Sequence, residues 1–334
     1  MILAKLAAAP CLAIVLVLSG CAPDTSQRLA GVVDVSAQNV AVMFPARGAT
    51  EVNPDAHFTL TFDAPPVIGS SGKIRILDAA DHFLVDELDM SIPVSPNPTG
   101  RAAGADGSTT APRPPAPAGP DNHGFQYDLI GGTYFHFFPI IVRGNTATIY
   151  PHQGKLEYGR RYIIKIEPGV LERADGTDVV FSDRGKWTFT TKAKGPGADV
   201  RLVVAADGSG DFNTVQGAVD HFPAKNPVPV EIVLKEGHYE EIVNIQGKSG
   251  ITIRGEDREK TVVGYANNSA FNRVRPAFIV NDSSDIQLSN FTINNYFIGQ
   301  ARGAADERRA QHCRSHDSER LGGCIHHRGH DLHG

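Results

Sequence analysis

A succession of short β-rich runs, with no helix-length segment between them, occupies residues 230–293 and constrains the fold more than any other feature. The runs are three to five residues long and lie between Gly, Asn and Asp residues, at 230–234, 242–245, 251–253, 261–263, 277–280, 286–288 and 291–293. Parallel strands of an ordinary α/β sheet need helical crossovers, and these intervals leave no room for them. The pattern therefore predicts strands that coil into a solenoid, in which each coil packs against its neighbours.

One short amphipathic helix precedes these runs, after an apolar strand at 201–205. Asn213 is a candidate N-cap, with Gln216 at the reciprocal third position. The apolar residues that follow share one helix face: Val215, Ala218, Val219 and Phe222. We expect this helix to cover the first coil, because a strand edge left open invites pairing with other chains.

The Gly-rich segment before the helix, Asp207-Gly-Ser-Gly-Asp-Phe212, has two interpretations. Free amides at a helix start attract anions, which would make the segment a phosphate cradle. No Lys-Ser/Thr pair follows the glycines, as a nucleotide-binding loop requires. We therefore favour a tight turn.

Residues 40–194 show a different pattern, in which apolar and polar residues alternate. The alternating segments are 57–62, 73–77, 146–150, 161–166 and 186–190, with Gly, Pro and Asp turns between them. Period two of this kind predicts an antiparallel sandwich. Residues 93–124 interrupt it with eight prolines and many small residues. We interpret them as an insertion within the sandwich, and a boundary between two small domains is the alternative.

Four pieces of this region resemble the bacterial Ig-like domain that often serves as a spacer in surface proteins. They are residues 44–54, 60–62, 156–162 and 187–190. The resemblance implies that the domain presents its neighbour and does not itself catalyse a reaction. Trp187 and the phenylalanines around it could form a carbohydrate-stacking face, but core packing is the favoured interpretation.

The first 21 residues have the layout of a signal peptide. Lys5 precedes an apolar stretch, Leu12-Ala-Ile-Val-Leu-Val-Leu18, that is too short to span a bilayer. Leu18-Ser-Gly-Cys21 resembles the lipobox of bacterial lipoproteins, which implies that Cys21 becomes the acylated first residue. We expect residues 1–21 to be a lipoprotein signal peptide, residues 22–39 a tether, and the chain to be lipid-anchored at the bacterial cell envelope, in the outer membrane. A plain secretory signal is the alternative.

Charge and cysteine content exclude two classes of protein. The formal net charge of −5 gives no broad basic surface, so we expect no nucleic-acid partner. The four cysteines, Cys11, Cys21, Cys313 and Cys324, leave none between residues 22 and 312. A disulfide framework therefore does not hold this protein together.

The most specific resemblance covers about residues 200–301. Its motifs include Val203-Val-Ala-Ala-Asp-Gly-Ser-Gly-Asp-Phe212, Lys235-Glu-Gly-His-Tyr-Glu-Glu241 and Ile251-Thr-Ile-Arg-Gly-Glu256. In order and spacing they resemble the pectinesterase family, whose members are parallel β-helices that hydrolyse the methyl esters of polygalacturonate without a metal. The predicted fold class is therefore mainly β: an N-terminal Ig-like β-sandwich at 40–194, followed by the first coils of a right-handed parallel β-helix at 199–301.

One segment departs from the common family pattern. Asn272-Arg-Val-Arg-Pro-Ala-Phe278 replaces the usual Ser-Ala-Thr type of sequence and looks more like the outer-membrane lipoprotein branch. Some members of that branch have been described as thioesterases. An acyl thioesterase-like activity is therefore an alternative to action on pectin.

The family mechanism needs several groups from successive coils. One aspartate attacks the ester carbonyl, a second transfers a proton, two glutamines hold the oxyanion and an arginine orients the nucleophile. The resemblance implies that Gln300, in Phe297-Ile-Gly-Gln-Ala301, is the first oxyanion-hole glutamine. We find no match in this sequence to the nucleophile, the acid/base aspartate or the arginine.

From residue 302 to residue 334 the strand periodicity stops. This tail holds six of the 13 histidines, and one interpretation is a metal site built from His312, Cys313, His316, Cys324, His326, His327, His330 and His333. The favoured interpretation is a shifted reading frame or an arbitrary extension, which gives an aberrant or disordered tail and binds no metal. We also expect the trailing edge of the solenoid to be open, because nothing apolar follows Ala301 in a strand pattern.

The sequence thus predicts a truncated and inactive carboxylic ester hydrolase of pectinesterase type. Its substrate class would be methylesterified polygalacturonate or a related acidic polysaccharide, with no cofactor and with membrane attachment through the lipid anchor. The alternative from another class is a noncatalytic surface lipoprotein that binds acidic polysaccharide.

Overall fold

The computed structural model describes residues 40–94, 124–181, 186–198, 200–224, 226–267, 269–272, 276–296 and 312–314. All of them lie in one compact unit, Val35–Gly334. Several predicted features lie outside the described residues: the signal peptide with Cys21, the tether, residues 95–123 of the insertion, Gln300, and the tail apart from 312–314. Within the described residues, no helix has the length and apolar character needed to cross a membrane.

Two sheets form the predicted sandwich. The first has the order β1-β3-β10-β9, from strands Val40–Phe44, Phe58–Phe62, Thr146–Ile149 and Ile140–Arg143. The second has the order β2-β13-β11-β5-β6, from Ala49–Val52, Trp187–Thr191, Arg161–Ile166, Lys73–Asp78 and Leu84–Asp89. Neighbours are antiparallel except β2 and β13, which are parallel. The period-two prediction is confirmed, because Phe58, Leu60 and Phe62 of β3 are buried and alternate with half-buried threonines.

Trp187 lies inside this sandwich. Its side chain is 4% exposed, contacts Phe58 edge-on with ring centroids 5.8 Å apart, and donates from Nε1 to the Pro45 carbonyl at 2.8 Å. A ring in this position is closed to sugar. The core-packing interpretation of Trp187 is confirmed.

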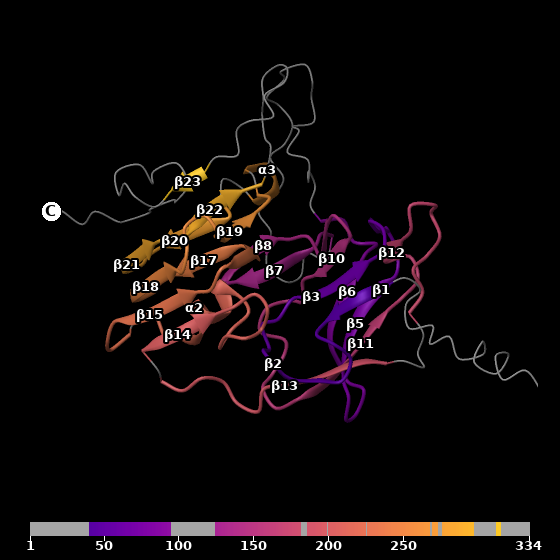
Figure 1. The fold of residues 1–334 in the computed structure, drawn as a ribbon, viewed down its shortest axis with the longest axis horizontal. Coiled ribbons are helices and arrows are strands. Elements are labelled where there is room, and N and C mark those ends of the chain that lie inside the picture. Colours follow the sequence, from indigo (N-terminus) through magenta and orange to yellow (C-terminus); the bar gives the residue numbers. More distant parts are fainter. Residues whose placement is uncertain are drawn as a thin grey trace, which may run out of the picture. The chain divides into compact units, whose positions relative to one another are not determined.

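Three parallel sheets form the predicted solenoid. The first contains β14 (Arg201–Val204), β15 (Val230–Leu234), β18 (Ser249–Gly255) and β21 (Ser284–Ser289). The second contains β16 (Gly237–Glu240), β19 (Thr261–Tyr265) and β22 (Thr292–Asn295), and the third β17 (Val243–Gln246) and β20 (Phe278–Asn281). The chain visits the three sheets in turn, and Figure 1 shows β14, β15, β18 and β21 as successive rungs.

The register of these strands places apolar residues of one coil next to apolar residues of the following coil. Ile232 pairs with Ile253 and Ile253 with Leu288, so the inward positions form a continuous apolar column along the coil axis. Each coil buries its apolar side chains against the next one. The prediction of a solenoid is confirmed at the level of strand pairing.

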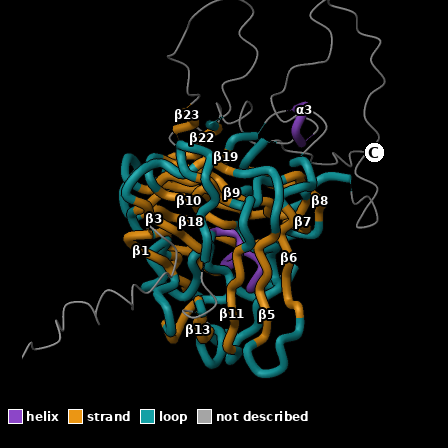
Figure 2. Tube along the Cα trace, turned by 90° about the vertical axis from the view of Figure 1, so that its right-hand side faces the viewer, coloured by secondary structure: helices purple, strands orange, loops and turns teal. Residues whose placement is uncertain are grey.

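Helix α2 (Val215–His221) covers the leading end of this column, as predicted. It contacts β14, β15 and β17, and Val215, Ala218 and Val219 are fully buried in the same cluster as the inward residues of the coils. Figure 2 shows α2 as a purple segment among orange strands.

The predicted capping box is wrong by one residue. The N-cap is Thr214, which accepts from the Gly217 amide at 3.0 Å. Asn213 and Gln216 are engaged elsewhere, since Asn213 accepts from Asn53 and Gln216 accepts from the Asn244 amide. Tertiary partners therefore override the local pairing that the sequence suggested.

The expectation of an open trailing edge is also wrong for the second solenoid sheet. Strand β23 (His312–Arg314) pairs antiparallel with β22, with Ile293 opposite Cys313. Strand pairing uses main-chain groups and needs no apolar side chains, which is why the apolar pattern did not reveal it.

The remaining described elements are short. Strands β7 (Tyr127–Ile130) and β8 (Thr133–His136) form a hairpin that belongs to neither sandwich sheet, β4 (Val67–Ile68) pairs with β12 (Leu171–Glu172), and α3 (Ser269–Asn272) lies between β19 and β20. The hairpin packs against the solenoid through Ile130 and Phe135, which cluster with Ile242 and Ile279. It follows the Pro/Gly-rich segment directly in sequence.

Candidate functional site

The first turn of α2 is one point where the sandwich and the solenoid meet through charged groups; the Arg143–Glu240 ion pair between β9 and β16 is another. Asp55, from the sandwich, accepts through Oδ2 from the amides of Asn213 and Thr214 at 2.9 and 2.8 Å and from the Thr214 hydroxyl at 2.8 Å. Glu241, from the loop after β16, accepts from the amides of Val215 and Gln216 at 2.8 and 2.9 Å. Two carboxylates thus occupy the donors that begin the helix.

This arrangement decides between the two interpretations of the Gly-rich segment. The amides that a phosphate would need are bonded to protein carboxylates, so no phosphate cradle exists here. Ser209 donates from its amide and its hydroxyl to Asp207 Oδ1, at 2.9 and 2.6 Å, and Gly208 has φ of +85°. These are the contacts of a tight turn, and the tight-turn prediction is confirmed.

Burial changes the acidity of both carboxyl groups. Desolvation raises the pKa of Asp55 above its ordinary value, although the bonds from Thr214 and Asn213 oppose the shift. Desolvation likewise raises the pKa of Glu241 from 4.5 to about 8, against the hydrogen bonds from Gln216 and Val215. At neutral pH the Glu241 carboxyl is therefore easily protonated inside the fold.

The outer face of the β17–β20 sheet is a further place where the two halves of the chain meet. Asn244, on β17, donates from Nδ2 to the carbonyls of Ile130 and Gly131 at 3.0 and 3.2 Å. Gly131 has φ of +52°, and a side chain there would lie 2.2 Å from the Asn244 carbonyl. Only glycine allows the hairpin to approach so closely.

Asn272, the first residue of the segment 272–278 that departs from the common pectinesterase pattern, takes part in the same contact. Asn272 accepts from the His136 amide at 2.7 Å and donates to the His136 carbonyl at 2.9 Å, in the manner of a paired strand. Tyr265 accepts from the Phe138 amide at 2.8 Å. The hairpin is therefore fixed to this flank of the solenoid by side chains that replace backbone pairing.

An aspartate–histidine pair lies within the sandwich. His152 Nδ1 is 2.6 Å from Asp86 Oδ1, and the His152 amide donates to Asp86 Oδ2 at 2.9 Å. The pKa of His152 is raised: burial would lower it, but the hydrogen bond and charge of Asp86 outweigh burial. The described residues that line the adjoining cavity include no serine or cysteine, and the hydroxyl of its threonine, Thr214, donates to Asp55 at 2.8 Å. We therefore assign the pair to ordering the turn at 151–154.

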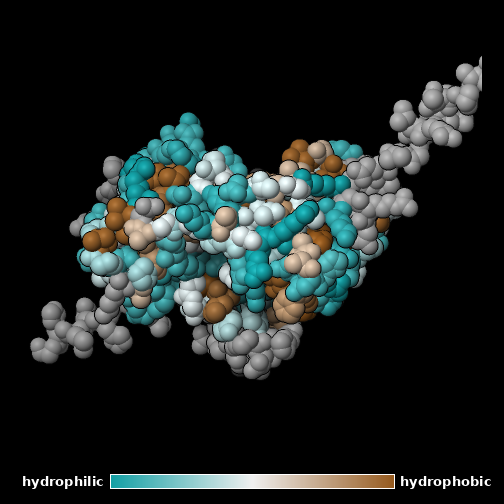
Figure 3. Space-filling model, turned by 90° about the horizontal axis from the view of Figure 1, so that it is seen from below, coloured by the Kyte–Doolittle hydropathy of each residue, from teal (hydrophilic) through white to brown (hydrophobic). Residues whose placement is uncertain are grey.

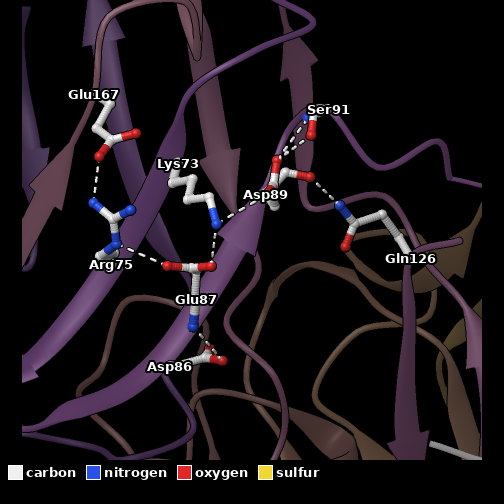
Figure 4. Close-up of polar contacts among 8 residues, drawn as sticks. All are labelled: Lys73, Arg75, Asp86, Glu87, Asp89, Ser91, Gln126 and Glu167. Atoms are coloured by element: carbon white, nitrogen blue, oxygen red, sulfur yellow. Dashed lines mark hydrogen bonds and ion pairs between the residues drawn. The ribbon is translucent and has the colours of Figure 1, made fainter. Parts of the chain in front are cut away.

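A network of ion pairs crosses β5 and β6, as Figure 4 shows. Lys73 Nζ lies 2.6 Å from Glu87 and 3.1 Å from Asp89, and Arg75 bridges Glu87 and Glu167. The hydrogen bond from Lys73 lowers the pKa of Glu87. Each charge in this network has an opposite partner and is partly exposed, so we interpret the network as a feature of the sheet surface.

The family model described as Pectinesterase matches residues 201–313, which contain α2 and all the parallel strands of the solenoid from β14 to β22. Residues 201–313 are thus similar to the pectinesterase family. The sandwich lies outside this match.

Curated pectinesterases match the same part of the chain. Pectinesterase 4 of Arabidopsis thaliana is 45% identical over 83 residues, which are 24% of this chain and 14% of that protein. Pectinesterase 5 of the same plant is 40% identical over 106 residues, which are 31% of this chain and 17% of that protein. The chain thus spans about a sixth of the length of these curated pectinesterases.

Among solved structures, a pectin methylesterase mutant in complex with a hexasaccharide is similar, at 23% identity and a TM-score of 0.26. The match covers 33% of this chain and 35% of that one. A second pectin methylesterase in complex with a hexasaccharide matches at 25% identity and a TM-score of 0.25, with the same coverage.

The two predicted site residues, Gln300 and Cys21, lie outside the described residues, so the structure brings neither to a site. Among the described residues, no group of three or more His, Cys, Asp or Glu side chains is placed to hold a metal. The groups that the sequence analysis missed are Asp55 and Glu241 at the start of α2. Glu241 was visible only as part of a family motif, and no local pattern marked Asp55.

Proposed function

We propose that this chain derives from a pectinesterase-type carboxylic ester hydrolase that removes methyl groups from polygalacturonate at the bacterial envelope. The observation that carries the proposal is the match of residues 201–313 to the pectinesterase family, which runs through consecutive coils and includes the motif of β16. Short coincidental matches do not follow the coils of a solenoid in register.

Gln300 is the proposed oxyanion-hole residue. It stands in Phe297-Ile-Gly-Gln-Ala301, the segment that resembles the first oxyanion-hole motif of the family. An amide placed there would donate to the oxygen of the ester carbonyl as negative charge develops. The attacking aspartate, the proton-transferring aspartate and the orienting arginine have no match in this sequence, so we propose that the chain as given is inactive.

Methanol release tests this proposal. The chain as given is expected to release none from methylated pectin, whereas a chimera in which residues 302–334 are replaced by the corresponding coils of a pectinesterase is expected to release it. In the chimera, Gln300→Ala should reduce kcat about 100-fold, since one oxyanion donor is lost. Methanol from the unmodified chain would disprove its inactivity, and a silent chimera that is folded would disprove the assignment to pectin.

Acyl thioesters are the second substrate class to test. The segment Asn272-Arg-Val-Arg-Pro-Ala-Phe278 favours them, because it departs from the common pectinesterase pattern. The same chimera is therefore assayed with an acyl thioester. Thioester cleavage without methanol release would move the activity to that class, and binding of acidic polysaccharide without either reaction would support a noncatalytic surface lipoprotein.

The proposed location depends on Cys21, and the proposed Ig-like sandwich would present the solenoid away from the membrane. Cys21→Ser is expected to abolish lipid labelling and leave a signal-bearing precursor, because the thiol is the acyl acceptor of a lipobox. Normal labelling of this variant would disprove the anchor. Cys11→Ser is the matched control, since this cysteine also lies in the proposed signal peptide but outside the lipobox.

A further inference from the structure

A cavity of about 190 Å³ lies where the sandwich meets α2. The sandwich contributes Asp55, His57, Gln153 and Tyr158 to its lining, and the region of α2 contributes Phe212 and Asp220. Neither half of the chain forms this cavity alone. Figure 3, which shows one face of the molecule, has apolar residues in several separate groups on that face.

Two oxygens of the lining are buried and have no hydrogen-bond partner among the described residues: Asp55 Oδ1 and Gln153 Oε1. Both residues are otherwise fixed. Asp55 uses its second oxygen for three donors at the start of α2, and the Gln153 amide donates to Asp128 at 2.9 Å. A buried acceptor without a donor costs about 1–3 kcal/mol. A molecule in the cavity that donates to these oxygens would remove this cost.

The charge of the lining defines the class of that molecule. Asp55 and Asp220 are acidic, and no lysine or arginine belongs to the described lining. His152, whose pKa is raised, also lines the cavity, but its Nδ1 is paired with Asp86, so the described lining offers an anionic group no unpaired cation. The donors of α2 already balance the charge of Asp55, and the amide of Gln153 is neutral. A neutral hydroxyl that donates a hydrogen bond therefore suits both oxygens better than a positively charged group. His57, whose pKa burial lowers to about 4, is uncharged at neutral pH.

The volume of the cavity and the aromatic side chains of its lining further restrict the class of ligand. An engineered cavity of about 150 Å³ holds benzene, so 190 Å³ is sufficient for one six-membered ring with small substituents. Tyr158 and Phe212 provide flat apolar surfaces on which the C–H groups of such a ring can rest.

We propose that this cavity binds a neutral, hydroxyl-rich ring of the size of one monosaccharide, whose hydroxyls donate to Asp55 Oδ1 and Gln153 Oε1. This site is distinct from the proposed esterase site, because it excludes the acidic sugar on which the esterase would act. It also contacts both halves of the chain, so its occupancy stabilises their junction.

Saturation-transfer NMR on the full chain tests the class of ligand. Three probes share a ring and differ in one substituent: D-galactose, D-galacturonic acid with a carboxylate, and D-galactosamine with an ammonium group. Saturation transfer is expected to be strongest to D-galactose. A chain that transfers to none of the three, or more strongly to either charged sugar, would overturn the proposal.

A pair of variants locates the binding. Gln153→Leu removes the unpartnered oxygen but keeps the amide that bonds Asp128, and it is expected to weaken D-galactose binding about fivefold or more. Gln287→Leu is the matched control, because this glutamine is exposed on β21, outside the cavity lining. This variant should bind D-galactose as the wild type does. If Gln153→Leu fails to fold, as judged by its melting temperature, Tyr158→Leu takes its place. Equal binding by the folded cavity variant and the wild type would show that the sugar binds elsewhere.

Discussion

The sandwich and the solenoid are both built from strands, but they complete their cores in different ways. The sandwich closes its apolar residues between two sheets, and its core cluster contains only its own residues. The solenoid has a column of apolar side chains with two ends, and its leading end is covered by α2. The start of that helix is in turn held by Asp55 of the sandwich. The sandwich is therefore self-contained, whereas the solenoid depends on its neighbour.

Separating the two regions should have the largest effect. We expect residues 199–334, expressed alone, to aggregate, because they lose Asp55 from α2 and the β7–β8 hairpin from Ile242 and Ile279. Residues 40–198 should stay soluble and keep exchange protection in β3 and β11. Size exclusion and amide exchange on both fragments measure this. A monodisperse 199–334 fragment with strong exchange protection around Phe291 would show that the solenoid does not depend on the sandwich.

Removing the carboxylate that joins the regions should have the next largest effect. Asp55→Ala leaves two amides and the Thr214 hydroxyl without their acceptor and is expected to lower the free energy of unfolding by about 2–3 kcal/mol. Faster amide exchange should be confined to α2, β14 and β15. Asp63→Ala, at another sandwich position, is the control. Uniform loss of protection across β3 and β11 would mean that the sandwich too depends on this contact.

A pH dependence should follow from Glu241. Its pKa is raised from 4.5 to about 8, so between these values the folded state binds more protons than the unfolded state. Stability from this group is full below pH 4.5 and decreases as pH rises to 8, by up to about 1.4 kcal/mol per pH unit. Urea unfolding at pH 6.5 and 8 measures the decrease. Glu241→Gln should reduce it, and an unchanged slope in this variant would assign the dependence to another group, such as His152.

A surface ion pair of the sandwich should have the smallest effect. Lys73→Gln removes the cation that pairs with Glu87 and Asp89, but Arg75 still pairs with Glu87, and the Lys73 side chain is partly exposed to solvent. We expect a melting temperature within about 1 °C of the wild type, measured at low and high salt. A shift as large as that of Asp55→Ala would place the ion-pair network of Figure 4 among the main supports of the fold.

Local patterns in the sequence predicted the strands and their class. Apolar and polar residues alternate along β3, and β15 and β18 are short apolar runs. Such patterns show which side chains face a core, and they can be read from neighbouring residues in the sequence. The family motifs of residues 201–313 were visible for a related reason, since each motif keeps one turn or one rung in place. The mainly β class and the solenoid therefore followed from the sequence alone.

The contacts between the regions were decided only by the tertiary structure. Asp55 meets Thr214 across 159 positions and Asn272 meets His136 across 136, and no periodicity links residues so far apart. The same contacts explain the wrong N-cap, because Asn213 and Gln216 found partners in other elements. The cavity that joins Gln153 to Asp220 exists only when the sandwich and α2 are in place. A hydrogen bond depends on distance in space, which a linear pattern of polar and apolar residues does not encode.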